Sequence, residues 1–268
     1  MNLRNLLIKT QWVLTTQLGI NPSLFLQTFR GIPFYFKNLI VFRKNFKGKI
    51  NLTPCFHDRF EEGGSAKSEY FWQDLHVARR INFNSPQKHV DVGSRVDGFI
   101  AHLASFREIE VFDIRPITSL IPGVVFKQID LMNNFFISTM TSDGGYCDSL
   151  SCLHTIEHFG LGRYGDPIDP EGYVKGLTNL TSLLKPGGRF YLSTPMGRER
   201  VEFNANWVFS PFTIFNIANT LNLKIERIDL IDSANGIIEC PADDFEILKK
   251  KISLENYNLV IMEFQKLN

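Results

Sequence analysis

Two histidines and a glutamate lie close together near the middle of the chain, in the segment His154-Thr-Ile-Glu157-His158. An imidazole that is oriented by a carboxylate can remove a proton from a hydroxyl group near neutral pH. The four-residue spacing favours placing both rings on one face of a short helix. We therefore predict that His158 acts as a general base, that Glu157 orients it and that His154 lies beside it. A purely structural role for the three residues is the alternative.

The same segment also has the H-x-x-E-H spacing of an inverted zinc-peptidase motif, in which both histidines would bind zinc. That motif needs a long helix and a third ligand, whereas Phe159-Gly160 ends the local helix almost at once. Sharing of a divalent ion by Asp166 and Glu157 is not supported by their spacing. We expect no metal site, and an assay with and without chelator separates the two hypotheses.

The loop from Gly160 to Pro170 is long for an α/β connection and rich in glycine, as is typical of a lid that covers a substrate. We predict that Arg163 and Tyr164 bind the acceptor and that Asp166 takes part in catalysis. Glu199 and Asn204, after the fifth predicted strand, would close the other side of the pocket. Turn formation explains the Asp-Pro pair at 166–167 equally well. A solvated loop would likewise explain Glu199 and Asn204.

A second group of polar residues lies where the predicted strands end. Asp91 to Arg95 follow the first strand, Asp113-Ile114 the second and Asp130-Leu131 the third. Asp113 lies 20 residues after Gly93, which is the interval at which an acidic side chain accepts hydrogen bonds from a nucleotide ribose. These positions predict a site for a nucleoside-containing cofactor.

The turn after the first strand departs from the G-x-G-x-G pattern, because Arg95 and Asp97 stand where the second and third glycines would be. A dinucleotide needs close approach of the backbone to its pyrophosphate, whereas S-adenosylmethionine has no pyrophosphate. The turn therefore favours S-adenosylmethionine over NAD. Arg95 is expected to pair with the carboxylate of this methyl donor.

Strands and helices alternate after Pro86 and predict an α/β fold. We expect a Rossmann-like sheet of seven mostly parallel strands with helices on both faces, so that the carboxyl ends of the strands meet at the ligand site. The predicted strands are 88–93, 108–114, 124–129, 146–153, 189–194, 224–231 and 258–264, and the clearest predicted helices are 69–81, 96–106, 171–184 and 211–220.

Residues 1–66 are predicted to form a basic helical extension and its connection, and residues 67–268 the α/β domain with its leading helix 69–81. Residues 1–57 contain eight Lys or Arg and no Asp or Glu. The extension is expected to be helical in short pieces, broken at Gly19, Pro22, Gly31 and Pro33. Peripheral membrane contact through residues 1–50, homodimer formation and a soluble aromatic cap are three alternatives for it.

No apolar stretch approaches the roughly 20 residues of a membrane-spanning helix, and the N-terminus lacks the pattern of a signal peptide. The four cysteines form no C-x-x-C pair and no dense disulfide framework, which favours reduced thiols. We expect a cytoplasmic protein, with the inner face of the membrane as a second location.

The order of elements, the Lys185-Pro-Gly-Gly188 segment before the fifth strand and Asp148 inside the fourth resemble class I S-adenosylmethionine-dependent methyltransferases. The passages YFWQDLHVARRI, HVDVGSRVDGFIAHL, FDIRPI, LHTIEHFGLGRYGDPID and GRERVEFNANWVF are similar to an uncharacterised methyltransferase-like family, a domain of unknown function, whose bacterial members often lie in surface-polysaccharide gene clusters. The resemblance implies contacts of Asp91, Gly93 and Ser94 with the methionine part of the donor, of Asp113 with the ribose, and of Asp130 and Leu131 with the adenine.

The expected function is O-methylation of a saccharide or sugar-linked intermediate in surface-glycan biosynthesis, with S-adenosyl-L-homocysteine as product. The acceptor is thus a small molecule or glycan. Two alternatives are a non-catalytic, cofactor-binding scaffold protein and a methyltransferase that acts on a membrane-bound, lipid-linked carrier. Nucleic acid is not expected, because the fourth strand lacks the Asn-Pro-Pro-Tyr type of end.

Overall fold

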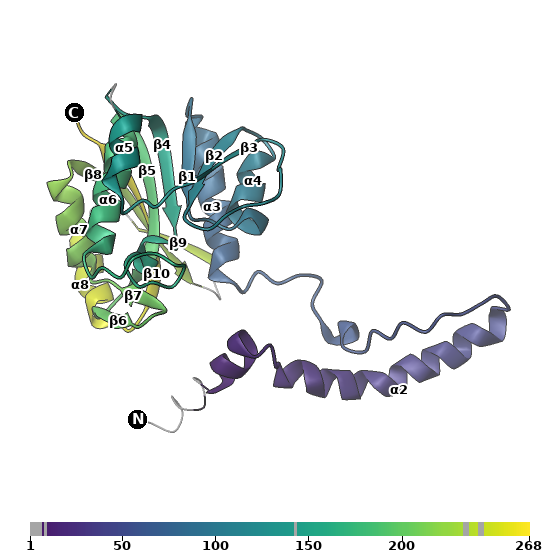
Figure 1. Cartoon of the computed structure of the whole chain (residues 1–268). Helices are drawn as coiled ribbons and strands as arrows, with labels where there is room; N and C mark the ends of the chain where they lie inside the picture. Colours follow the sequence, from purple (N-terminus) through teal and green to yellow (C-terminus); the bar gives the residue numbers. More distant parts are fainter. Residues whose placement is uncertain (1–6, 8–9, 142–143, 233–235, 241–243) are drawn as a thin grey trace. The chain divides into compact units, whose positions relative to one another are not determined.

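The computed structural model describes residue 7 and residues 10–141, 144–232, 236–240 and 244–268 (Figure 1). The chain forms two compact units, Met1–Ser65 and Ala66–Asn268. Each is described by itself below.

The first unit is built around one long helix, α2 (Pro22–Asn45), between a π-helical turn, η1 (Val13–Gln17), and a 3-10 turn, η2 (Asp58–Phe60). Asn21 caps α2 by accepting a hydrogen bond from the Ser23 amide, and Pro22 occupies its first turn, where no amide donor is needed. None of the described helices is long and apolar enough to cross a membrane.

The predicted breaks at Gly31 and Pro33 are wrong, because α2 continues through both residues. Gly31 is buried, and a Cβ atom there would lie 1.8 Å from the carbonyl oxygen of Phe56. The connection after the helix therefore packs directly on the helix backbone, and Phe56 also contacts Tyr35 with ring centroids 5.4 Å apart. These tertiary contacts offset the cost of glycine and proline inside a helix.

The second unit contains, within the described residues, a sheet of eight strands in the order β3-β2-β1-β4-β5-β10-β8-β9. The first five strands in the chain pair in parallel, whereas β10 is antiparallel to both β5 and β8. The strands are β1 (His89–Val92), β2 (Ile109–Asp113), β3 (Val124–Gln128), β4 (Cys147–Leu153), β5 (Leu184–Met196), β8 (Leu223–Asp232), β9 (Gly236–Cys240) and β10 (Asn258–Lys266). The Rossmann-like, mostly parallel sheet is thus confirmed.

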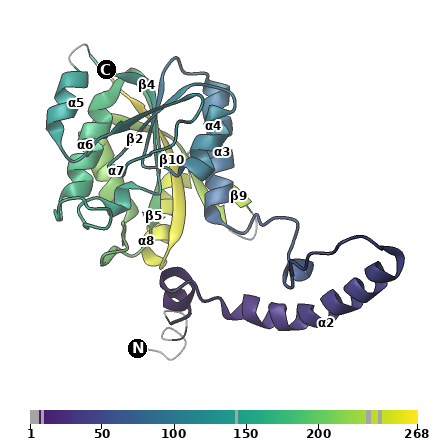
Figure 2. The same cartoon turned by 45° about the vertical axis from the view of Figure 1, so that its right-hand side comes forward.

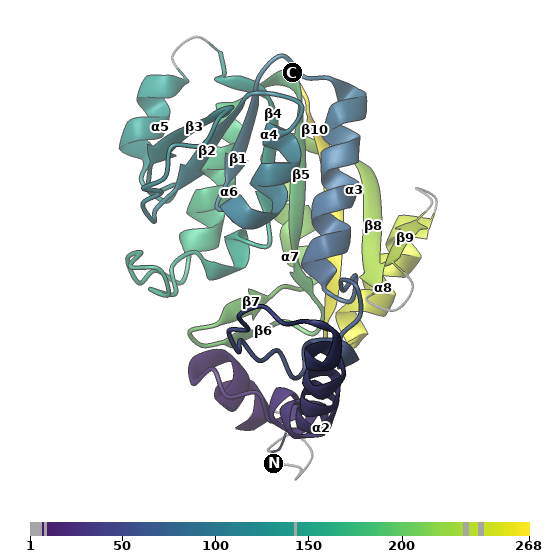
Figure 3. The same cartoon turned by 90° about the vertical axis from the view of Figure 1, so that its right-hand side faces the viewer.

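Helices cover both faces of this sheet (Figure 2; Figure 3). One face carries α3 (Glu69–Asn84), the π-helical turn η3 (Val96–Ile100) and α4 (Ala101–Ala104). The other carries α5 (Asn134–Met140), α6 (Gly172–Leu183), α7 (Pro211–Thr220) and α8 (Phe245–Leu254). Alternate residues of a strand enter opposite core layers, as in β2, where Phe112 lies in one and Val111 in the other.

Three details differ from the expected elements. The predicted helix 96–106 is divided, because Gly98 leaves the helical region with φ −126° and ψ −112°. Strand β9 and an antiparallel hairpin, β6 (Arg200–Glu202) with β7 (Asn206–Val208), are additional. The hairpin strands are only three residues long, which is too short for the alternation of polar and apolar residues to identify them.

Candidate functional site

The strand order reverses at β1, with β2 and β3 on one side of it and β4 on the other. Ligands of doubly wound sheets bind at such a reversal, outside the carboxyl ends of the strands. Gly93 leaves β1 at this point with φ +76°, and a Cβ atom on it would lie 2.3 Å from the Thr155 side chain, which follows β4. This turn therefore accepts only glycine.

A chain of buried hydrogen bonds between β1 and β4 stabilises the turn. Ser149 and Ser151 of β4 bind the two ring nitrogens of His89 at 2.7 and 3.1 Å, and the Ser151 hydroxyl also donates to Asp91 at 2.5 Å. Ser94 donates to Asp91 through both its hydroxyl and its amide. Burial raises the pKa of Asp91 to about 7. Asp91 thus holds the turn together from inside, whereas the resemblance implied direct contact of Asp91 and Ser94 with the cofactor.

Asp113 ends β2 next to this turn and is 7% exposed. Arg115 donates to it through its amide at 2.8 Å, through Nε at 3.0 Å and through Nη2 at 2.6 Å. Nη2 of the same arginine also donates to the Gly93 carbonyl at 3.2 Å, and the guanidinium lies 4.5 Å from the ring centroid of Tyr164. Sequence analysis missed Arg115, although its place two residues after Asp113, the position predicted to bind the ribose, is a signal.

The other predicted cofactor residues differ in exposure. Arg95 is exposed and pairs with Asp97 at 2.6 Å. Leu131 is buried in the core, and its carbonyl accepts a hydrogen bond from Asn179. Asp130 is half-buried and accepts from the Met132 amide, while Ile114 is half-buried with its carbonyl bound by Gln128. Arg95 thus already has a partner in Asp97, and the buried Leu131 side chain packs in the core.

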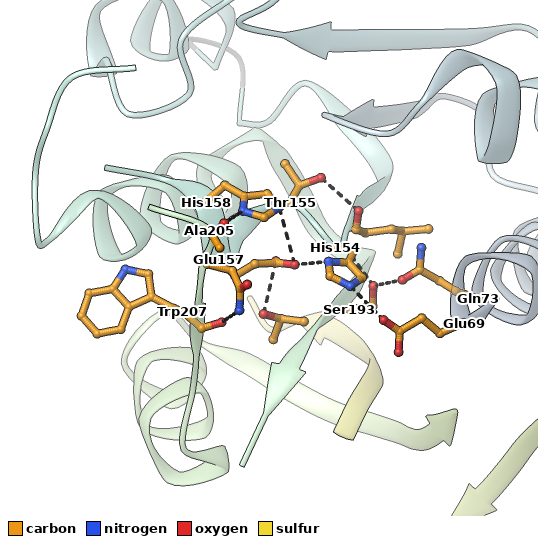
Figure 4. A network of polar contacts seen from close by, with 12 residues as sticks. Glu69, Gln73, His154, Thr155, Glu157, His158, Ser193, Ala205 and Trp207 are labelled. Carbon is orange, nitrogen blue, oxygen red and sulfur yellow. Dashed lines mark hydrogen bonds and ion pairs between the residues drawn. The ribbon is translucent and has the colours of Figure 1, made fainter. Parts of the chain in front are cut away.

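His154, Glu157 and His158 come together directly after β4 (Figure 4). His154 has a left-handed backbone with φ +52°, and the next residues form a single 3-10 turn, η4 (Ile156–His158), rather than a helix. Glu157 is fully buried and forms an ion pair through Oε1 with Nδ1 of His154, whereas Nε2 of His158 is 4.0 Å from the same oxygen. Glu157 therefore contacts His154 more closely than the histidine that it was expected to orient.

His158 is oriented instead by the turn between β6 and β7. Its Nδ1 donates to the Ala205 carbonyl at 2.7 Å, and Nη1 of Arg163 donates to the same oxygen at 2.8 Å. Tyr164 meets the His158 ring edge-on at 5.4 Å. Burial lowers the pKa of His158, with a contribution from Arg163, despite the opposing effect of Glu157. The ring is therefore neutral near pH 7, with its lone pair on Nε2.

His154 has the opposite protonation. Its Nε2 lies 3.5 Å from Glu69, and Tyr70 stacks on the ring with centroids 4.9 Å apart. Burial by itself would lower the pKa of His154, but the carboxylates of Glu157 and Glu69 outweigh it and raise the pKa to about 10. Burial would raise the pKa of Glu157, and His154 outweighs that effect and lowers it. In this structure His154 is thus an imidazolium between two carboxylates.

Helix α3 contributes residues that sequence analysis did not assign to the site. Besides Glu69 and Tyr70 it provides Gln73, which is buried and bound by the Ser193 hydroxyl of β5. Tyr257 donates to Glu69 at 2.6 Å. The sequence did contain a signal for these residues. Gln73 and Asp74 are polar, yet they lie on the same buried face of α3 as the apolar Val77 and Ala78.

Two other predicted site residues have structural partners of their own, and a third is exposed. The Asp166 carboxylate accepts amide hydrogen bonds from Gly160, Gly162 and Tyr164 and so shapes the loop. Glu199 accepts from Thr213 and from the Ser210 amide at the start of α7. Asn204 is exposed in the turn of the hairpin.

Comparison with known proteins gives a partial family match. A family model described as "Caenorhabditis protein of unknown function, DUF268" matches residues 127–226. No curated protein matches the chain.

Several solved structures are similar to the chain. The [4+2]-cyclase SpnF is 12% identical, with a TM-score of 0.51 over 77% of this chain and 84% of that chain. A 1,6-didemethyltoxoflavin-N1-methyltransferase from Burkholderia thailandensis, solved with S-adenosylhomocysteine, is 12% identical, with a TM-score of 0.48 over 73% of this chain and 79% of that chain. The N-methyltransferase NodS from Bradyrhizobium japonicum WM9 is 14% identical, with a TM-score of 0.48 over 75% of this chain and 99% of that chain. The chain thus shares its Rossmann-like fold with SpnF.

Proposed function

We propose that this protein is an S-adenosylmethionine-dependent methyltransferase. The observation that carries the proposal is the meeting of the Gly93 turn with Asp113 at the reversal of strand order. An acidic side chain at the end of the second strand suits a ribose diol. A dinucleotide is disfavoured, because Arg95 and Asp97 replace the glycines that a pyrophosphate requires.

The contacts of Asp113 are compatible with a bound ribose. A carboxylate offers about four acceptor positions. Arg115 donates twice to Oδ1 and once to Oδ2, so Oδ2 can still accept a bond from a ribose hydroxyl. Arg115 would then lie beside the ribose and restrict its position.

Isothermal titration with S-adenosylhomocysteine tests the proposal. We expect micromolar binding to the native protein and at least about tenfold weaker binding to Asp113→Asn, because a charged hydrogen-bond acceptor is lost. Asp97→Asn is the matched control, since Asp97 is exposed and pairs with Arg95. Absence of binding by folded native protein, or equal losses in the two variants, would contradict the proposal.

The acceptor that we propose is a hydroxyl of a saccharide or sugar-linked intermediate in surface-glycan biosynthesis. The support is the family resemblance together with a neutral histidine at the site. The cofactor supplies an electrophilic methyl group, and Nε2 of His158 accepts the proton of the acceptor hydroxyl. The Ala205 carbonyl stabilises the resulting imidazolium through Nδ1, while Arg163 and Tyr164 border the acceptor.

Methyl transfer from labelled S-adenosylmethionine to nucleotide sugars and glycans tests this acceptor. We expect His158→Gln to lower kcat by about 10²-fold or more while the affinity for S-adenosylhomocysteine is unchanged. Binding without transfer to any acceptor would favour the scaffold alternative. Transfer to a lipid-linked carrier alone would favour the third function considered above.

For the first unit we propose contact with an anionic lipid surface. Helix α2 exposes large apolar side chains, among them Phe25 at 66%, Leu26 at 66% and Ile40 at 61%, and its last turn carries Arg43 and Lys44. Exposed apolar residues with basic neighbours, in a segment that has no acidic residue up to His57, fit the interface of an anionic bilayer.

Vesicle flotation of the full chain tests this contact. We expect binding to phosphatidylserine vesicles, weaker binding to neutral vesicles, and loss of binding in Phe25→Ser/Leu26→Ser. Arg43→Gln/Lys44→Gln should weaken only the anionic preference. A concentration-dependent dimer that ignores both kinds of vesicle would contradict the proposal and favour homodimer formation.

A further inference from the structure

The arrangement of His154, Glu157 and His158 is not fully explained by an ion pair or by a general base. Each has one polar atom engaged by a neighbour that holds it in place. Nε2 of His154 faces Glu69 at 3.5 Å, Nδ1 of His158 donates to the Ala205 carbonyl at 2.7 Å, and Oε2 of Glu157 accepts from Thr194 at 3.3 Å. The remaining atoms are Nδ1 of His154, Oε1 of Glu157 and Nε2 of His158.

Those remaining atoms face one another. One ligand atom from each of the three residues lies within 4.8 Å of the others. Nδ1 of His154 and Oε1 of Glu157 are buried and have no partner with hydrogen-bond geometry among the described residues, although the two form an ion pair. Buried polar atoms of this kind are costly unless a cation or a hydrogen bond satisfies them.

We propose that His154, Glu157 and His158 bind a divalent transition-metal ion such as Zn²⁺ or Co²⁺. Two imidazoles and one carboxylate are a common ligand set for these ions, whereas Mg²⁺ and Ca²⁺ prefer oxygen ligands alone. Ligand atoms about 2.1 Å from a tetrahedral ion lie about 3.4 Å apart. Binding therefore requires Nδ1 of His154 and Oε1 of Glu157 to move apart, and Nε2 of His158 to move closer to Oε1 than its present 4.0 Å.

The partners of the ligands strengthen this assignment. A histidine that binds a metal usually donates its second ring nitrogen to a carboxylate or a backbone carbonyl, which fixes its orientation. Glu69, itself bound by Tyr257 at 2.6 Å, has this place beside His154, and Ala205 has it beside His158. The metal replaces the proton that His154 holds against Glu157, so binding releases that proton to solvent.

The proposal revises the expectation that the chain has no metal site. The objection to the zinc-peptidase motif, that no long helix follows His154, is correct for η4. The left-handed backbone of His154 nevertheless turns its ring toward Glu157. The loop therefore brings the two side chains together without a helix. With the ion bound at Nε2, His158 can no longer accept a proton there, and the ion takes over the activation of the acceptor hydroxyl. That role rests on the proposed function, but the binding site does not.

The test is binding of Co²⁺ to the full chain after treatment with chelator, followed by its visible absorption spectrum and by calorimetry. We expect one equivalent in this site, with displacement by Zn²⁺. His158→Gln and Glu157→Gln should each lose it, and Glu69→Gln should weaken it by about tenfold through the orientation of His154. Thermal unfolding of each variant establishes that it is folded, and His158→Gln suffices if Glu157→Gln does not fold.

His57→Gln is the control, because His57, Asp58 and Glu61 form another His/acid group in the first unit, with Asp58 and Glu61 exposed. Loss of Co²⁺ in His57→Gln alone, or native-like binding in folded His158→Gln, would overturn the proposal, as would absence of binding by folded native protein. Titration with S-adenosylhomocysteine is independent of these outcomes. Co²⁺ binding without S-adenosylhomocysteine binding would therefore reject the proposed function and leave the metal site standing.

Discussion

Gly93 lies where the turn after β1 approaches Thr155 in the segment after β4. Its φ of +76° costs an L-residue about 1–2 kcal/mol, and a Cβ atom would additionally lie 2.3 Å from Thr155. We expect Gly93→Ala to lower the free energy of unfolding by about 1–3 kcal/mol more than Gly165→Ala, which has φ +85° and open space around it. Equal losses in urea unfolding would show that the contact with Thr155 is unimportant.

His89 makes stability depend on pH. Burial, together with Arg107, lowers its pKa from 6.5 to about 3. Below about pH 6.5 the unfolded chain binds a proton at this residue that the folded protein refuses, so its contribution to stability is present above that pH and is lost as the pH falls toward 3. Urea unfolding between about pH 4 and 7 should therefore show a steeper decline for the native protein than for His89→Gln. Parallel declines would contradict this.

At the scale of single elements, α2 depends on contacts outside itself. Gly→Ala in an exposed helix normally stabilises it by about 1 kcal/mol. At Gly31 we expect the opposite, since a methyl group would displace the connection at Phe56. Far-UV circular dichroism and thermal unfolding of Gly31→Ala measure the effect. Asn38→Ala, at an exposed position of the same helix, is the control and should raise helicity; a rise in both would contradict the packing.

The elements of the α/β unit were largely predictable, because a helix or strand with one buried face has apolar residues at regular intervals in the sequence. Pro211 marks the start of α7, and helix α3 begins at Glu69 as predicted and runs three residues beyond Ile81. Where the backbone departs from regular helix or strand geometry, the spacing of apolar residues no longer predicts the structure. Gly98 divides a predicted helix, and the β6–β7 hairpin is too short to show alternation.

At the scale of the whole molecule, the two units differ in their cores. Gly31 is the buried residue among the described part of Met1–Ser65, whereas two apolar clusters fill Ala66–Asn268. Segments with little buried surface open at low free-energy cost and are cleaved first. Limited proteolysis followed by mass spectrometry should therefore remove residues before Ser65 and leave a stable fragment from about Ala66 onward. First cleavage inside the sheet would contradict this.

Three features could be predicted from the sequence: the α/β class, the position of Gly93 and Asp113 at strand ends, and the segment that carries His154, Glu157 and His158. These features follow from local periodicity and from the rule that parallel strands present their carboxyl ends together. Which side chains meet became clear from the three-dimensional structure. Asp91 turns toward Ser151, Glu157 pairs with His154, and Glu69 arrives from a helix 85 residues earlier in the chain than His154. Such pairings depend on strand order and helix packing, which bring together residues whose separation along the chain carries no periodic signal.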